Sequence, residues 1–112
     1  MLFRSREGTD CTIVARSFTV PQALKAAEIM QAEFDVSVEV VDPRTIKPLD
    51  IDTIVASVKK TNRLVIAEES HAFASVGAEI SHQVMENAFD YLDAPIKRIS
   101  DRKSTRLNSS HG

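Results

Sequence analysis

Short apolar, β-branched runs alternate along the chain with longer segments in which apolar residues recur every three or four positions. The short runs are 11–15, 36–41 and 64–67, and residues 2–6 and 96–99 form further short segments ahead of and behind them. Runs of four to eight such residues are typical of strands that are buried on both faces of a sheet. We therefore predict three buried strands, a short final strand at 96–99 and an edge strand at 2–6.

A first helix is predicted from about residue 21 to residue 34. Thr19 and Gln22 have the spacing of a capping box, and Pro21 falls in the first turn, where a missing N–H group costs no hydrogen bond. Apolar residues then recur along one face of this helix: Ala23, Ala27, Met30 and Phe34.

Two more helices follow a loop, 42–50, that contains two prolines. Asp50 can cap a helix that stops near Asn62, and Ser75 begins a helix that ends before Asp93-Ala94-Pro95. Their apolar stripes are Ile51, Ile54, Val55 and Val58, and Val76, Ile80, Val84, Ala88 and Leu92. Alternating strands and helices predict a three-layer α/β/α fold with a mostly parallel, mixed sheet of about five strands.

The charge balance argues against two classes of partner. Fourteen basic and sixteen acidic side chains give a net charge of −2, which is not the basic surface that nucleic acid or an anionic membrane attracts. The only cysteine, Cys11, has no disulfide partner within the chain, and we interpret it as a small buried hydrophobic residue. No leader and no apolar stretch of about 20 residues is visible, so we expect a cytoplasmic protein.

The last twelve residues, 101–112, differ from the rest of the chain. They contain one large apolar side chain, Leu107, among Arg, Lys, Ser, Thr and Asn, and cannot extend a core. Residues 101–111 also resemble, position by position, one reading frame of a common sequencing-adapter oligonucleotide. We therefore predict one truncated domain, 1–100, and a non-native polar tail, 101–112, translated from an adapter; a natural solvated tail is the alternative.

The most site-like residues follow the run 64–67. Glu68, Glu69 and His71 would lie at the carboxyl edge of the sheet, where open α/β proteins bind ligands. A histidine beside a carboxylate can do acid–base work, but no nucleophile stands near them in the sequence. We predict an interface or loop-anchoring role for Glu69 and His71, and for Arg44, whose guanidinium suits pairing with a carboxylate.

Two isolated residues receive structural interpretations. Gly77 is expected to permit close helix packing in preference to binding an anion. His82 should face solvent, away from the apolar stripe of its helix, and the His and Glu spacing matches no standard zinc pattern. The sequence predicts no catalytic, cofactor-binding or metal-binding residue.

Five blocks resemble one family in order and spacing. They are REGTDCTIV (6–14), VDPRTIKPLD (41–50), ASVKKTNRLV (56–65), VGAEI (76–80) and FDYLDAP (89–95). Together these blocks resemble the C-terminal, transketolase C-terminal-like domain of the β subunit of pyruvate and other 2-oxo-acid dehydrogenase E1 components. The resemblance implies a mixed five-stranded sheet in which 2–6 is the extra strand.

The resemblance also implies a role in assembly. The complete E1 of that family decarboxylates a 2-oxo acid on thiamine diphosphate, with magnesium, and acylates lipoate on E2. Those cofactors are held elsewhere in the enzyme, so this segment is expected to bind neither and to be inactive alone. Its implied partners are the E1 α subunit, a second β subunit and the E2 acyltransferase, and without them apolar surface should stay exposed.

Two alternatives remain open. The first is a free-standing, non-catalytic docking or dimerisation module. The second is the same domain from an acetoin or branched-chain 2-oxo-acid dehydrogenase, because the family's substrate contacts lie outside this segment.

Overall fold

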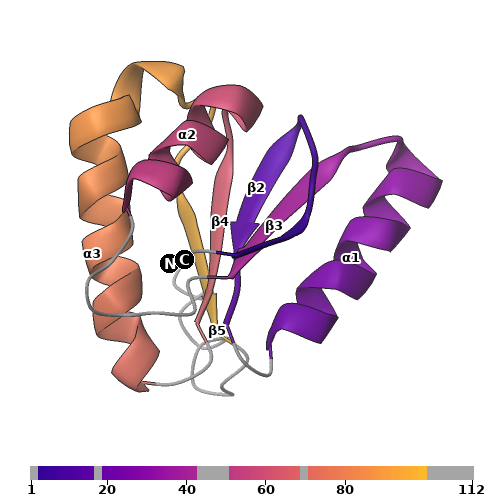
Figure 1. Ribbon diagram of the computed structural model, residues 1–112, viewed down its shortest axis with the longest axis horizontal. Coiled ribbons are helices and arrows are strands. Elements are labelled where there is room, and N and C mark those ends of the chain that lie inside the picture. Colours follow the sequence, from indigo (N-terminus) through magenta and orange to yellow (C-terminus); the bar gives the residue numbers. More distant parts are fainter. Residues whose placement is uncertain (1–2, 17–18, 43–50, 69–70, 101–112) are drawn as a thin grey trace, which may run out of the picture.

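The computed structural model describes residues 3–16, 19–42, 51–68 and 71–100. Five strands and three helices form an α/β sandwich (Figure 1). Their bounds are β1 Phe3–Arg6, β2 Cys11–Val14, α1 Thr19–Phe34, β3 Val38–Asp42, α2 Ile51–Thr61, β4 Leu64–Glu68, α3 His71–Ala88, a 3₁₀ turn η1 Phe89–Tyr91, and β5 Lys97–Ser100.

The sheet has the order β1-β3-β2-β4-β5. Strand β1 pairs with β3 in antiparallel fashion, and the three other neighbouring pairs are parallel. All five strand predictions are confirmed, and the segment predicted as an edge strand does lie at an edge. The predicted three-layer, mostly parallel mixed sheet is therefore the observed fold.

The chain direction explains the layers. From β2 the chain moves to β3 on one side, and from β3 it crosses back to β4 and β5 on the other side. Because parallel crossovers are right-handed, this reversal places the first helix on one face and the later helices on the other. Figure 1 shows α1 on one side of the sheet and α2 with α3 on the opposite side.

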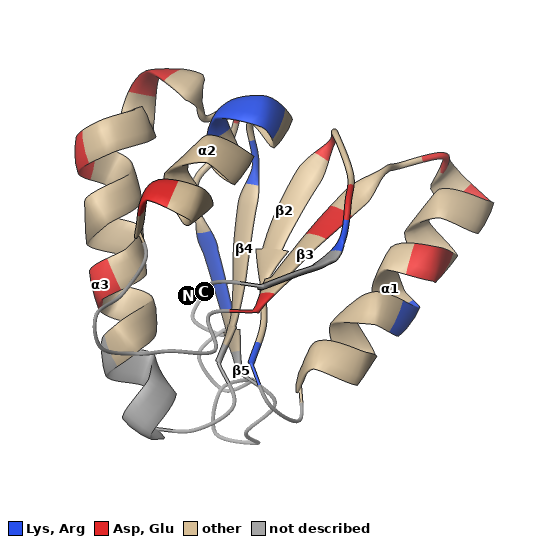
Figure 2. Cartoon of the chain, viewed as in Figure 1, with Lys and Arg blue, Asp and Glu red and all other residues tan. Residues whose placement is uncertain are grey.

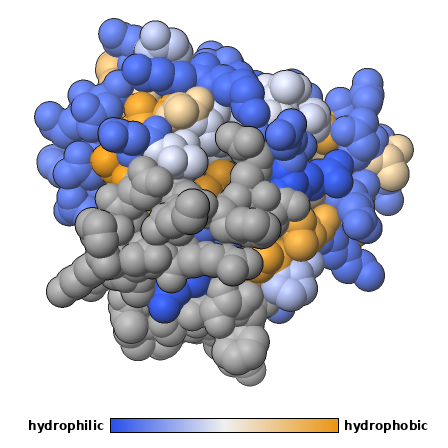
Figure 3. Space-filling model, in the orientation of Figure 1, coloured by the Kyte–Doolittle hydropathy of each residue, from blue (hydrophilic) through white to orange (hydrophobic). Residues whose placement is uncertain are grey.

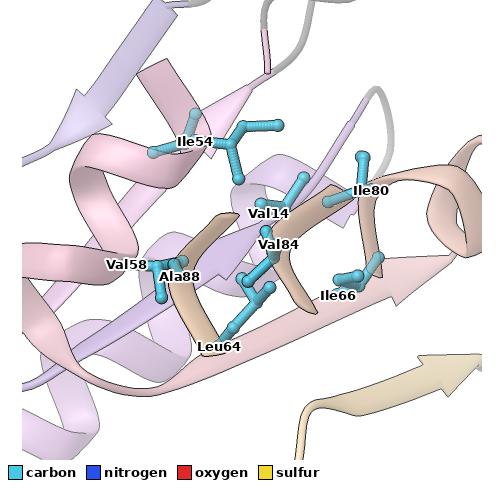
Figure 4. Packing of buried hydrophobic residues seen from close by; sticks show 9 residues of the cluster. Val14, Ile54, Val58, Leu64, Ile66, Ile80, Val84 and Ala88 are labelled. Atoms are coloured by element: carbon cyan, nitrogen blue, oxygen red, sulfur yellow. The ribbon is translucent and has the colours of Figure 1, made fainter. Parts of the chain in front are cut away.

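The larger core lies between the sheet and α2 and α3. Alternate residues of the strands, such as Val14, Leu64 and Ile66, meet the predicted stripes of the two helices (Figure 4). The helix residues at the centre of this core are Ile54, Val58, Ile80, Val84 and Ala88, each at most 1% exposed. These stripes were predicted correctly because they follow the helical period.

The smaller core lies under α1 and corrects two predictions. Ala23 and Ala27 are buried against Val38 and Val40 as expected, but Phe34 is 63% exposed. Phe34 is the last helical residue, and the chain turns back at Asp35, which has a φ of 56°, so the buried stripe ends before it. The capping box is also wrong: Thr19 is already helical, and its hydroxyl bonds the backbone of Arg16.

The remaining helix ends are close to those predicted, except that α3 differs at both ends; its α-helical part stops at Ala88, and the 3₁₀ turn Phe89–Tyr91 follows. Helix α2 stops at Thr61, and Asn62 follows with a left-handed φ of 69°. Helix α3 begins at His71, four residues before the predicted start at Ser75, because Ala72-Phe73-Ala74 can continue a helix although they add no capping signal. The Asp50 cap, the loop 43–50 and the tail 101–112 lie outside the described residues.

Within the described residues, no helix has the length and apolar character needed to cross a bilayer. Large hydrophobic side chains are nevertheless exposed on several elements: Ile29, Phe34, Met85, Phe89, Tyr91 and Ile99.

Candidate functional site

The predicted interface residues fall mostly outside the described part of the chain. Arg44 and Glu69 are not among the described residues, and His71 is placed only as the first residue of α3. The strand ahead of Glu69 and His71, β4, is parallel to β2, and the two strands connect onward to opposite sides of the sheet. The backbone thus puts His71 near the switch point of the sheet, and the roles of all three residues stay predictions.

The two isolated residues are placed by the structure. His82 is exposed, as predicted, and Gly77 is buried. Since α3 begins at His71, Gly77 lies in its second turn and not at the helix N-terminus, where an anion would bind. Among the described residues no group of three His, Cys, Asp or Glu side chains is placed to hold a metal ion.

A buried carboxylate is the first feature that the sequence did not predict. Glu39 of β3 is 0% exposed. One oxygen, Oε1, accepts hydrogen bonds from the Gly8 backbone N–H at 3.1 Å and from Lys60 Nζ at 2.5 Å. The other, Oε2, accepts from the Ser57 hydroxyl at 2.6 Å. A buried charge is tolerated only when it is paired and hydrogen-bonded in this way.

Three hydroxyls extend this network beneath α2. Ser57 donates its single proton to Glu39, so it accepts from Thr12 at 2.7 Å. Thr12 in turn lies 2.6 Å from the Thr61 hydroxyl, which also approaches the Arg63 carbonyl at 3.2 Å. The Thr12 and Ser57 protons therefore both point toward the carboxylate, whereas the single Thr61 proton is shared between the Thr12 hydroxyl and the Arg63 carbonyl. Such a chain of hydroxyls strengthens the bonds in it.

Gly8 holds the turn between β1 and β2 against this network. A Cβ atom at this position would lie 2.3 Å from the Val38 carbonyl carbon and 2.5 Å from the Glu39 nitrogen. Only glycine permits so close an approach between two backbones. The turn, β3 and α2 thus meet at the Glu39 carboxylate.

Two pKa values are shifted by these surroundings. Burial opposes ionisation of Glu39, but the hydrogen bonds from Lys60, Ser57 and Gly8 outweigh it and lower the pKa of the carboxyl below its ordinary value. Burial raises the pKa of the Cys11 thiol, and nearby Arg63 offsets this in part. Cys11 is half-buried, so it is less enclosed than predicted, and its raised pKa makes it a poor nucleophile.

An exposed apolar hollow with carboxylates is the second unpredicted feature. It has a volume of about 520 Å³ and lies where α3, η1 and the approach to β5 meet. The described residues that line it are Met85, Phe89, Asp90, Leu92, Asp93, Ala94 and Pro95, which include two acids and no Lys or Arg. We call this surface the acidic hollow.

Its hydrophobic residues are unusually open to solvent. Phe89 is 61% exposed and Met85 is 42% exposed. Figure 3 shows orange and tan atoms over the upper part of α3 and α2, with hydrophilic surface around them. Figure 2 shows acidic positions along α3 and at the turn that follows it. Exposed apolar surface with a polar rim is typical of a protein interaction site.

Each feature has a weak signal in the sequence. Glu39 stands alone in the apolar run 36–41, and a charge inside a strand predicted to be buried on both faces needs partners. Phe89 and Tyr91 are aromatic residues near the end of the last predicted helix, but they do not belong to its apolar stripe. The partners themselves, such as Gly8 and Ser57, are brought together only by the fold.

The fold and its connections define a class, the C-terminal domain shared by transketolase-like proteins. A solved split-gene transketolase, an inactive β4 tetramer, superposes with a TM-score of 0.76 at 27% sequence identity, covering 100% of this chain and 36% of that chain. The family model for the transketolase C-terminal domain matches residues 3–104. The chain therefore belongs to the transketolase C-terminal domain family.

Its curated relatives are β subunits of the pyruvate dehydrogenase E1 component. The Rickettsia felis subunit is 58% identical over 97 residues, covering 87% of this chain and 29% of the relative. The mitochondrial subunit of Saccharomyces cerevisiae is 52% identical over 96 residues, covering 85% of this chain and 26% of the relative. The chain thus spans less than a third of these relatives.

Proposed function

We propose that this chain is the C-terminal assembly domain of the β subunit of a thiamine-diphosphate-dependent pyruvate dehydrogenase E1. The complete enzyme decarboxylates the 2-oxo acid and acylates the lipoyl group of E2, and this domain has no activity alone. The observation that carries the proposal is the 58% identity, over 97 residues, to a pyruvate dehydrogenase E1 β subunit.

The proposed assembly role agrees with where charge and apolar surface lie. The buried carboxylate of Glu39 is hydrogen-bonded to donors of its own chain. The acidic hollow, in contrast, presents Asp90, Asp93 and an exposed Phe89 to solvent. Carboxylates beside an exposed aromatic ring favour a partner that carries Lys or Arg around an apolar side chain. We propose that this partner is a basic segment of the E2 acyltransferase.

The other partners and the cofactors follow from the family. The E1 α subunit and a second β subunit complete the proposed enzyme, and thiamine diphosphate and magnesium are held by parts that this segment lacks. Arg44, Glu69 and His71 are proposed to anchor loops or contact one of these subunits at the carboxyl edge of the sheet. The compartment is proposed to be the cytoplasm of a bacterium, although some relatives are mitochondrial.

A chimera tests the assembly role. Residues 3–100 would replace the corresponding segment of the Rickettsia felis β subunit, which would be expressed with its α subunit and E2. We expect an α–β complex that binds E2 and oxidises pyruvate with added thiamine diphosphate. A chimera that folds but binds neither α nor E2 would refute the assembly role.

The two alternatives predict other outcomes. A free-standing docking module would bind E2 or itself as the 112-residue chain, with the same affinity whether or not an α subunit is present. A domain from an acetoin or branched-chain enzyme would assemble better in a chimera with the β subunit of that enzyme. Comparing the chimeras by size-exclusion chromatography separates the three possibilities.

A further inference from the structure

The C-terminal end of α2 is hydrogen-bonded to the segment that forms the acidic hollow. Asn62 follows that helix with a φ of 69°, and its N–H bonds the Val58 carbonyl at 2.7 Å. This is a left-handed helix cap, a conformation that Gly and Asn adopt most readily. The cap turns the remaining polar groups of Asn62 toward the segment that follows η1.

Two hydrogen bonds join Asn62 to that segment. Its side-chain amide donates to the Tyr91 carbonyl at 2.7 Å. Its own carbonyl accepts from the Asp93 backbone N–H at 2.8 Å. Between them, the Leu92 N–H bonds the Phe89 carbonyl at 3.1 Å, so the backbone is held on both sides of Leu92.

A third contact comes from the preceding turn of α2. The Lys59 ammonium lies 5.1 Å from the centroid of the Tyr91 ring, within the range of a cation–π interaction. The last turn of α2 thus holds the Tyr91 ring through Lys59, and Asn62, directly after the helix, holds the Tyr91 backbone.

We propose that Asn62 is a positioning residue that fixes the acidic hollow in one conformation before a partner binds. A surface that is already ordered loses less conformational freedom on association, which favours affinity. The identity of the partner rests on the proposed function, but the ordering is a property of this chain.

Asn readily adopts the left-handed backbone conformation and also has a side-chain amide that can donate to the Tyr91 carbonyl. Gly adopts the same backbone but has no amide to donate to Tyr91. Asp tolerates the left-handed conformation, but its ionised carboxylate accepts hydrogen bonds only and would face the Tyr91 carbonyl. Asn62→Gly and Asn62→Asp therefore remove the same hydrogen bond in two different ways.

Tyr91 supplies a built-in reporter. The chain has one Tyr and no Trp, so its intrinsic fluorescence comes from Tyr91, in the 3₁₀ turn between Phe89 and Leu92 of the acidic hollow. In the full chain we expect both variants to lower the Tyr91 fluorescence anisotropy and to speed hydrogen exchange at the Asp93 amide by about 10-fold, as a locally opened segment does. Asn87→Ala, which removes an exposed Asn that bonds Gln83 within α3, should change neither.

E2 binding separates this proposal from the one on which it rests. In surface plasmon resonance with E2 acyltransferase, the variants should bind several-fold more weakly than the unchanged chain. If the unchanged chain does not bind E2, the docking proposal fails, and the exchange and anisotropy data still decide the role of Asn62. Unchanged exchange and anisotropy in both variants would overturn that role.

Discussion

The two acidic features on either side of the α2 C-terminus have opposite relations to solvent. Glu39 is 0% exposed, and Gly8, Ser57 and Lys60 all donate to it. Asp90 and Asp93 are exposed beside an open apolar hollow. A carboxylate whose donors come from its own chain stabilises the fold, whereas carboxylates held in place at an open apolar surface are available to a partner.

The two features also differ in how the chain builds them. The Glu39 network joins the β1–β2 turn, β2, β3 and α2, so it forms only when these four parts of the chain have come together. The acidic hollow comes from one continuous stretch, 85–95. Substitutions in the network should therefore lower the stability of the whole domain, and substitutions in the hollow should lower binding and leave the fold intact.

The largest effect is expected from Glu39→Ala. It removes the acceptor of three hydrogen bonds, and breaking a buried charge pair destabilises by about 3 kcal/mol or more, reduced here because Lys60 is 40% exposed and can return to water. Glu39→Gln keeps the shape and one accepting oxygen, whereas its NH2 group only donates, so it should cost less than the loss of the whole side chain. Urea unfolding followed by circular dichroism measures both, and a change below about 0.5 kcal/mol for Glu39→Ala would show that the network is not structural.

Gly8→Ala should have the next largest effect. The added Cβ meets backbone atoms of Val38 and Glu39 at 2.3 and 2.5 Å, and backbone cannot move aside as a flexible side chain does. Overpacking of this kind costs about 1–3 kcal/mol. Thr9→Ala, at the next residue of the turn, which is exposed, serves as the control. Equal melting temperatures for the two variants would contradict the close contact.

A pH series examines the charge on Glu39 separately from its shape. Because the folded pKa lies below the ordinary value of 4.5, the carboxylate stabilises the fold at pH values above 4.5, and this stabilisation is lost as pH falls through the lowered folded pKa. The stability difference between the unchanged chain and Glu39→Gln should be constant from pH 6 to 8 and shrink below about pH 4.5. A difference that grows on acidification would give the opposite sign for the pKa shift.

The sequence predicted the fold better than the site, for a physical reason. Strands and helix stripes such as Ile80, Val84 and Ala88 follow from the local period of apolar residues. Phe34 fits the same period and is exposed nonetheless, because a period does not show where the helix leaves the sheet. Local pattern therefore predicts elements, but not where their ends lie against a neighbour.

The candidate sites depend on contacts between distant residues. Gly8 and Glu39 are 31 positions apart, and Asn62 and Tyr91 are 29 apart, so no spacing rule connects them. Glu69 and His71 were predicted to lie at the carboxyl edge because they follow a predicted parallel strand, and this position can be inferred from the sequence. The Glu39 network lies at the opposite, amino end of the parallel strands, where topology predicts no site.

The smallest effect on stability, with a clear effect on binding, is expected from Asp93→Asn. Asp93 is exposed, and its structural contact is made by its backbone N–H, so its side chain can lose its charge at a cost within about 0.5 kcal/mol. Loss of a carboxylate at the proposed docking surface should nevertheless weaken E2 binding, and Asp93→Lys should weaken it further by repelling a basic partner.

Glu28→Gln removes an exposed acid from α1, on the other face of the sheet, and should leave the affinity unchanged. Surface plasmon resonance at two salt concentrations measures the effect, because attraction between exposed charges is screened by salt. If Asp93→Lys binds as tightly as Glu28→Gln, the exposed carboxylates have no part in docking, and the distinction between the two acidic features would rest on burial alone.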